Sequence, residues 1–212
     1  MRKTTLKNIA SPKKKRISTN DLSEVSFFKL QDDVIALRPF GRKELLSDDY
    51  LKWMNDPSVT QTIGRYDYLM PVSRKKLIDY FNGLDSASTI FLAIYRMNTT
   101  SRFKPEKCTF IGTLKIYDID ALSRRASIGI LIGEKQEWGK GHAQRAIRLA
   151  SQYIFDVLGL RKIFAGYLST NIGMERAFLK NGFKKEAVFK KHLYFAGQLV
   201  DHVFVSKFRS PI

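Results

Sequence analysis

The sequence has one cysteine, three histidines and no long apolar run. Cys108 alone cannot form an internal disulfide, and its apolar surroundings indicate a buried structural residue. No apolar run approaches the roughly 18 residues of a membrane-spanning helix, and the N-terminus lacks the apolar core of a secretory signal. His142, His192 and His202 have no metal-ligand spacing with Cys108 or with an acidic pair. We therefore expect a cytoplasmic protein that binds neither a membrane nor a metal.

Acidic residues are also scarce, with 20 against 37 basic residues and a net charge of +17. Residues 1–16 hold seven positive charges and no acid. Such a run is more often a solvated tail than a nuclear-localisation or nucleic-acid-binding segment. A chain of 212 residues can build one full core but not two typical domains. We expect a basic extension over residues 1–25 and one domain over residues 26–212, whose positive charge favours an anionic ligand.

Apolar periodicity gives the order of elements along this domain. Three consecutive stretches, 89–95, 109–117 and 126–132, have the composition of strands and suggest an antiparallel meander. From Gly141 to Leu158 apolar residues recur every three or four positions, which predicts the strongest helix. Around these we expect a strand at 34–38, helices at 49–55 and after an N-cap at Ser73, a strand at 162–168, a short helix from Thr170 to Asn181, and two final strands that flank residues 196–198.

The junction between the third stretch and the long helix has the features of an anion site. A strand ending at Gly133 leads through Gly139-Lys140-Gly141 directly into the helix. The first N–H groups of a helix lack intrahelical partners and lie at the positive end of its dipole, so a phosphate can bind there. Glycine at 139 and 141 allows positive φ and close approach of a ligand. The spacing matches neither the dinucleotide-binding nor the P-loop pattern, and glycine before a helix also occurs without a ligand.

Two segments resemble motifs of the GNAT superfamily of N-acetyltransferases. Residues 136–143, Gln-Glu-Trp-Gly-Lys-Gly-His-Ala, are similar to its acetyl-CoA-binding motif, in the form frequent in the branch named for ribosomal-protein N-terminal acetyltransferases. Residues 171–183, which start at Asn171 and end in Lys-Asn-Gly-Phe, resemble the Asn-containing loop and helix of that family. The resemblance covers residues 34–208 and leaves only the basic extension outside.

The resemblance implies an α/β (α+β) GNAT fold: a mixed seven-stranded, mostly antiparallel sheet with splayed fourth and fifth strands, flanked by about four helices. It also implies acetyl-CoA as cosubstrate. The pantetheine arm would enter the splay, amides of the loop and helix would hold the pyrophosphate, and Lys140 or Arg145 could add charge. Asn171 would contact the cofactor, cap its helix, or do both. The implied cofactor-binding residues are Ile130, Leu131, Ile132, Gln136, Trp138, Gly139, Lys140, Gly141, His142, Ala143, Gln144, Asn171 and Phe178.

The proton acceptor is where the sequence departs from the family pattern. Acetyl transfer needs an unprotonated amine near the thioester carbonyl and a donor for the oxyanion, implied here to be a backbone N–H near Ile130. The expected fourth strand, 126–132, contains no carboxylate. Glu134 just beyond it is our first candidate for the base, followed by Asp118 and Asp120. Each also fits a solvated turn residue, and proton loss to solvent without one essential base is the alternative.

The proton donor departs from the pattern as well. Many relatives carry a tyrosine proposed to protonate the leaving thiolate, and that position here is Phe178, which has no proton to donate. Tyr194 and His192 on a terminal strand are possible substitutes, although both also fit ordinary sheet residues.

Regions that select the acceptor amine in this fold are rich here in aromatic and charged side chains. Aromatic faces beside Arg and Asp suit a sugar, so we expect a small-molecule amine such as a nucleotide-linked aminosugar. A protein N-terminus is the main alternative. A basic surface disfavours polyamines and aminoglycosides. A non-catalytic CoA-binding module, a nucleic-acid-binding tail and a homodimer also stay open. The expected acceptor-site residues are Trp53, Arg65, Tyr66, Tyr68 and His192, with Asp67 and Tyr194 nearby.

Overall fold

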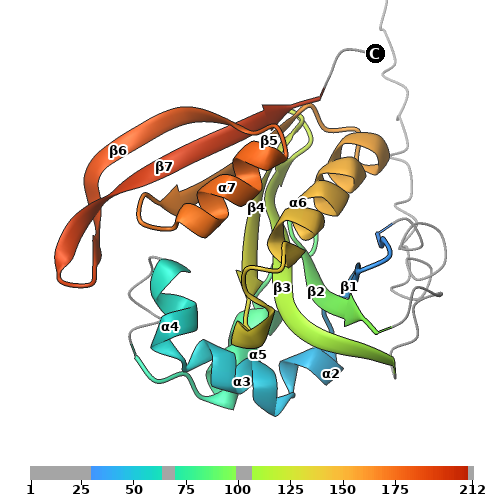
Figure 1. The fold of residues 1–212 in the computed structure, drawn as a ribbon. Coiled ribbons are helices and arrows are strands. Elements are labelled where there is room, and N and C mark those ends of the chain that lie inside the picture. The colour runs from blue at the N-terminus through green and yellow to red at the C-terminus, as the bar shows by residue number, and fades with distance from the viewer. Residues whose placement is uncertain (1–29, 64–69, 99–106, 210–212) are drawn as a thin grey trace, which may run out of the picture.

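The computed structural model describes residues 30–63, 70–98 and 107–209 (Figure 1). The basic extension and three expected acceptor-site residues, Arg65, Tyr66 and Tyr68, lie outside the described residues. No helix within the described ranges is long and apolar enough to cross a bilayer.

Seven strands form one mixed sheet in the order β1-β2-β3-β4-β5-β7-β6 (Figure 1). Every neighbouring pair is antiparallel except β4 and β5, which are parallel. The mixed, mostly antiparallel sheet expected from the sequence is confirmed. The strands are β1 (Ile35–Pro39), β2 (Ile90–Met97), β3 (Cys108–Asp120), β4 (Arg125–Ile132), β5 (Lys162–Leu168), β6 (Lys184–Phe195) and β7 (Gln198–Phe208).

The parallel strands β4 and β5 separate after three residue positions. Residues 125–127 of β4 pair with residues 162–164 of β5, and β4 has no β5 partner beyond Ser127. The expected splay is therefore present. Along residues 128–132, the backbone edge of β4 that faces β5 has no pairing with β5. Backbone groups on such an edge can bind an extended ligand as they would bind another strand.

The helices divide into an N-terminal group and two later helices, one before and one after β5 in the chain. α6 (His142–Gln152) joins β4 to β5, as a parallel connection requires, and it continues in a π-helical turn to Val157. α7 (Ile172–Lys180) follows β5. The N-terminal group consists of α2 (Arg42–Leu45), α3 (Asp48–Met54), α4 (Pro57–Thr60), a 3₁₀ turn (Gln61–Ile63) and α5 (Arg74–Asn82).

Local capping explains why the N-terminal group has more helices than the two expected from the sequence. The Ser47 hydroxyl accepts a hydrogen bond from the Tyr50 N–H at 3.2 Å and starts α3. The Asp56 carboxylate accepts one from the Ser58 N–H at 2.9 Å and starts α4. Pro57 occupies the first turn, where its missing N–H costs nothing. The Asp-Pro pair thus ends one helix and begins the next.

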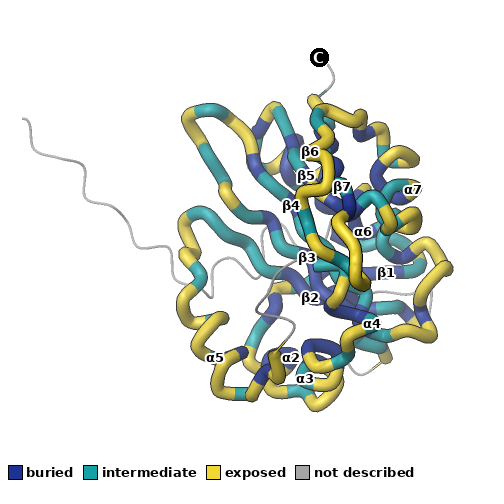
Figure 2. The backbone as a smooth tube through the Cα atoms, turned by 90° about the vertical axis from the view of Figure 1, so that its left-hand side faces the viewer, coloured by how far each residue is buried: buried dark blue, intermediate teal, exposed yellow. Residues whose placement is uncertain are grey.

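An apolar core lies on each face of the sheet. On one face the strands pack against α6 and α7 through residues such as Leu114, Ile147 and Phe178. On the other face Tyr95 of β2 packs with residues of α3 and α5 such as Trp53. Figure 2 shows β2 and β3 as almost entirely buried or intermediate, whereas α5 is largely exposed. Residues of β4 contribute to both cores, Ile128 to one and Leu131 to the other.

Candidate active site

The loop before α6 has the backbone geometry that its glycines were expected to allow. Gly139 and Gly141 have φ of 77° and 81°, a region that residues with a side chain rarely adopt. Nothing lies within 4 Å of a Cβ built at either position, so the backbone angle rather than crowding requires glycine. Gly141 is the N-cap of α6 without a capping side chain, and the first turn holds no acidic residue. The first N–H groups of α6 are therefore available to an anion.

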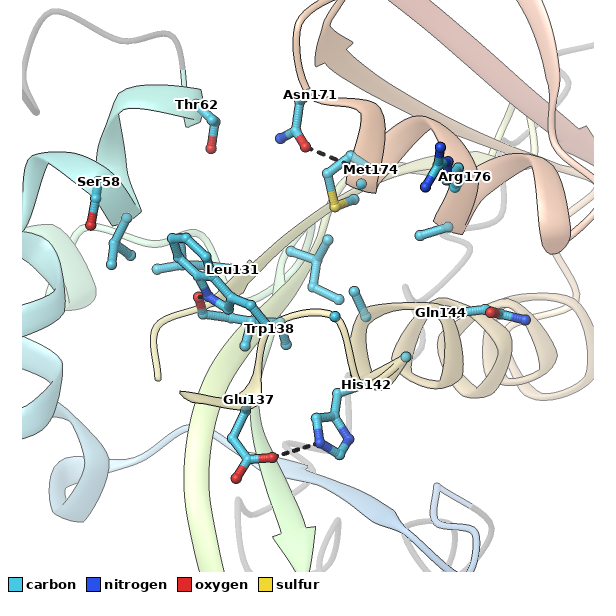
Figure 3. A pocket seen from close by; sticks show the side chains of 18 of the residues that line it. Ser58, Thr62, Leu131, Glu137, Trp138, His142, Gln144, Asn171, Met174 and Arg176 are labelled. Carbon is cyan, nitrogen blue, oxygen red and sulfur yellow. Dashed lines mark hydrogen bonds and ion pairs between the residues drawn. The ribbon is translucent and has the colours of Figure 1, made fainter. Parts of the chain in front are cut away.

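The start of α6 and the released edge of β4 open into one cavity of about 540 Å³. In Figure 3, Asn171 and Met174 at the start of α7 lie across this cavity from Leu131 and Trp138, with Ser58 at one side. Its lining includes ten of the expected cofactor-binding residues: Ile130, Leu131, Ile132, Trp138, Gly139, Gly141, His142, Ala143, Gln144 and Asn171.

A buried carboxylate holds the loop against the start of α6. Glu137 accepts a hydrogen bond from His142 Nε2 at 2.8 Å (Figure 3). Its oxygens also lie 3.1 Å from Arg96 Nε and 3.3 Å from Lys140 Nζ. Burial acts to raise the pKa of Glu137, but the hydrogen bonds from His142 and Lys140 and the charges of Arg96 and Lys140 lower it overall. Glu137 is thus an ionised residue that holds the loop in place. This role was not predicted from the sequence, because its partner Arg96 lies far from Glu137 along the chain.

Two further side chains fix the walls of this cavity. The Trp138 indole Nε1 donates to the Ile132 carbonyl at 2.8 Å, which ties the loop to the end of β4. The Asn171 Oδ1 accepts from the Met174 N–H at 3.1 Å and caps α7. Because Asn171 also lines the cavity, the capping and cofactor-contact roles expected from the sequence are compatible.

Positive charge reaches the cavity from α7 rather than from α6. Arg145 is paired with Asp32 at 3.0 Å and with Asp33 at 3.1 Å, so its charge is already matched. Arg176 and Lys180, one helical turn apart on α7, line the cavity instead. Neither residue was predicted from the sequence, because the side of a short helix that faces a cavity depends on how the helix packs.

A second cavity of about 290 Å³ adjoins the first. Both cavities share Thr62, Ile130, Leu131, Asn171 and Met174 as lining residues, so they meet at the splay. Among the described residues, the second cavity is lined mainly by aromatic and apolar side chains, with one cation. These include Tyr50, Tyr80, Phe91, Thr113, Lys115, Tyr117, Tyr167 and Phe178.

The candidate catalytic residues line neither cavity. Glu134 accepts a hydrogen bond from the Gln136 N–H at 3.1 Å and caps the turn Lys135–Glu137. Asp118 is exposed at an irregularity of β3, with φ of 51°. Asp120 pairs with Arg125 at 3.3 Å. Tyr194 is 72% exposed near the tip of the β6–β7 hairpin.

Other expected site residues also lie apart from the cavities. Trp53 is a core residue whose ring fills the space above Gly133, where a Cβ would lie 2.1 Å from the ring. His192 stacks on His202, with ring centroids 6.0 Å apart, and lines neither cavity. Gln136 and Lys140 do not line the first cavity, and Phe178 lines only the second.

Comparison with known proteins agrees with this geometry. Residues 35–184 match the family described as Acetyltransferase (GNAT) domain. The chain is 29% identical over 136 residues to the probable N-acetyltransferase YjcK of Bacillus subtilis, a match that covers 64% of this chain and 70% of that protein. It is 28% identical over 108 residues to the spermidine N(1)-acetyltransferase of Escherichia coli, which covers 47% of this chain and 58% of that protein.

The fold is shared with a spermidine N-acetyltransferase from Vibrio cholerae solved in complex with CoA and spermine. The TM-score is 0.69 at 19% identity, and the match covers 82% of this chain and 95% of that chain. The splayed strands, the glycine loop and the family match thus agree, and the chain belongs to the GNAT family, as an N-acetyltransferase that uses acetyl-CoA.

Proposed function

We propose that this enzyme transfers acetyl directly from acetyl-CoA to a primary amine of a small molecule, with a nucleotide-linked aminosugar as the favoured acceptor. The observation that carries the proposal is the second cavity, which meets the first at the splay. Its volume is near that of a small-ligand site. Rings such as Tyr80, Phe91 and Tyr117 offer flat faces to a sugar, and Thr113 offers a hydroxyl.

The cofactor would occupy the first cavity. Pantetheine would pair with the released backbone of residues 130–132, and the N–H groups at the start of α6 would bind the pyrophosphate. Arg176 and Lys180 would contribute charge to the phosphates. The thioester would then lie where the two cavities meet, with a β4 backbone N–H near Ile130 as donor to the oxyanion.

The proton that the acceptor amine loses would pass to solvent rather than to one essential base. No acidic residue is among the described residues that line the second cavity. In the first cavity, Glu137 is held by three basic side chains. Placing the free amine beside the thioester can itself supply much of the acceleration. A protein N-terminal amine is the alternative acceptor, and a CoA-binding module without catalysis is the alternative function.

The first experiment compares two glycines with the same backbone angle. Gly141 and Gly197 have φ of 81° and 85°, and neither has an atom within 4 Å of a built Cβ. Glutamate at either position therefore costs similar strain, roughly 1–2 kcal/mol. Only Gly141→Glu also places a carboxylate at the expected pyrophosphate site, whereas Gly197 lies in the β6–β7 turn.

We expect acetyl-CoA at about 100 times its Kd to raise the free energy of unfolding by about 2.7 kcal/mol. Gly197→Glu should keep this stabilisation and Gly141→Glu should lose it, as measured by thermal shift. Thiol release is then measured with aminosugar nucleotides and N-terminal peptides. Release only with peptides would replace the small-molecule proposal, and stabilisation without release for any acceptor would favour the CoA-binding module.

A further inference from the structure

Lys115 lies in the floor of the second cavity. It pairs with Phe91 of β2 on one side and with Gly129 of β4 on the other. Because side chains alternate along a strand, Thr113, Lys115 and Tyr117 of β3 share one face, and all three line the cavity. Gly129 directly precedes Ile130 and presents no side chain, so the Lys115 cation lies next to the place where the two cavities meet.

The charge of Lys115 is not matched by a carboxylate within the described part of the chain. Its Nζ donates to the Tyr80 hydroxyl at 2.9 Å and lies 5.5 Å and 4.8 Å from the ring centroids of Tyr80 and Tyr117. Two aromatic faces stabilise an ammonium but leave its net charge in place. No acidic side chain is among the described residues that line this cavity. Lys115 therefore differs from Lys162 and Lys185, which pair with glutamates.

A fixed cation in a partly closed cavity selects ligands by charge. An anionic group on the acceptor would form a charge-assisted hydrogen bond with Nζ. A second ammonium group would instead be repelled, because charges interact more strongly in such a site than in bulk water. A nearby cation also disfavours the protonated form of the acceptor amine, which helps a site whose described lining residues include no acid to act as a base.

We infer that the acceptor is an amine that carries an anionic group, a phosphate or a carboxylate, and that Lys115 binds this group. The inference rests on the proposed function and specifies its substrate class. It separates this enzyme from its relatives named spermidine acetyltransferases, since a polyamine has only cationic groups to offer the second cavity.

The test uses pairs of acceptors that differ only in the anionic group. Glucosamine 6-phosphate is compared with glucosamine, and an amino acid is compared with its amide. A nucleoside-diphosphate-linked aminosugar is compared with the free aminosugar, and spermidine is included as a polycation. The wild-type enzyme should prefer at least one anionic partner by about tenfold or more in kcat/KM. The pair that shows the preference distinguishes phosphate from carboxylate.

Two variants assign this preference to Lys115. Lys115→Gln should raise KM for the anionic acceptor by about tenfold with a smaller change in kcat, and remove the preference. The matched control is Lys207→Gln, because Lys207 also lies over an aromatic ring, that of Phe155 at 5.9 Å, but lines neither cavity. The control should keep both KM and the preference.

Stabilisation by acetyl-CoA is measured on each variant, because it reports folding and the cofactor site independently of the acceptor. If that stabilisation is intact, two results overturn the inference: no anionic acceptor used better than its uncharged partner, or a preference that survives in Lys115→Gln. Loss of acetyl-CoA stabilisation in the wild type would instead overturn the proposed function.

Discussion

At the scale of the residue, Glu137 lies in the loop before α6 and contacts three basic side chains: Arg96 of β2, Lys140 of the loop and His142 of α6. Glu137→Gln removes the charge while keeping the shape. We expect it to lower the free energy of unfolding by about 2 kcal/mol, since hydrogen bonds to charged groups contribute about 1.5–3 kcal/mol each. KM for acetyl-CoA should rise more than kcat falls. Chemical denaturation and steady-state kinetics measure both effects.

Glu134→Gln is the matched control for this variant. Glu134 lies three residues earlier and its carboxylate accepts one backbone hydrogen bond, from the Gln136 N–H. It should change stability by less than about 1 kcal/mol and leave kcat nearly unchanged. A large loss of kcat in Glu134→Gln would restore Glu134 as the base and contradict proton loss to solvent.

The residues that sequence reasoning misplaced are those whose role depends on contacts distant in sequence. Trp53 was expected in an acceptor wall because aromatic residues often line such walls, yet its ring fills the space above Gly133. Lys115 was not singled out because only the register of β3 with β2 and β4 brings it to the cavity floor. By contrast, Gly139 and Gly141 were predicted because their positive φ is a local requirement.

At the scale of the element, α7 presents Arg176 and Lys180 to the first cavity, where we propose that acetyl-CoA binds. Arg176→Ala and Lys180→Ala should each raise KM for acetyl-CoA by about tenfold, the loss of one charge-assisted contact. With acetyl-pantetheine, which has no phosphates of the nucleotide part, the same variants should match the wild type. Lys184→Ala, an exposed residue of β6 outside both cavities, is the control. An equal defect with both donors would show that α7 acts through packing.

Elements with strong local signals were predictable. α6 follows from its apolar periodicity, and Ser73 was expected as the N-cap of α5, where its hydroxyl accepts from the Lys76 N–H at 3.2 Å. The division into α2, α3 and α4 was not predicted, because helices of four to seven residues carry too little periodicity and depend on caps such as Asp56.

At the scale of the whole molecule, acid should unfold this protein steeply. Several carboxylates have lowered pKa values in the fold: Asp32, Asp56, Asp85, Asp120, Glu137, Glu175, Glu186 and Asp201. Hydrogen bonds from Lys135 and Ser58 lower the pKa of Asp56 to about 2, and those from Ser123 and Arg125 lower the pKa of Asp120 to about 2.

A carboxylate with a lowered pKa stabilises the fold above its unfolded pKa, and this contribution is lost as pH falls through the folded value. The melting temperature should therefore change little from pH 7 to about 5 and fall between about 4.5 and 2. Asp56→Asn keeps the helix cap but loses the pair with Lys135, so its pH dependence should be shallower. A melting temperature that rises below pH 4 would contradict this account.

The overall fold could be predicted because each family motif directly follows one of the splayed strands in sequence, residues 136–143 after β4 and residues 171–183 after β5, and the helix and strand patterns between the motifs are regular. The mixed seven-stranded sheet with splayed fourth and fifth strands followed from that resemblance. The second cavity could not be predicted in the same way, since its described lining comes from four strands, β2 to β5, and from α3, α5, α7 and a 3₁₀ turn, which only the folded chain brings together.

The short β4–β5 pairing has a mechanical consequence. Within the plane of the sheet, the half formed by β1–β4 is joined to the half formed by β5–β7 only through the paired residues 125–127 of β4 and 162–164 of β5. On the proposed function, a cofactor arm placed between the two halves would contact both of them and would border the second cavity at the five lining residues that the cavities share. On the proposed function we therefore expect acetyl-CoA to bind before the acceptor, an order that initial-rate kinetics with each substrate varied in turn would show or contradict.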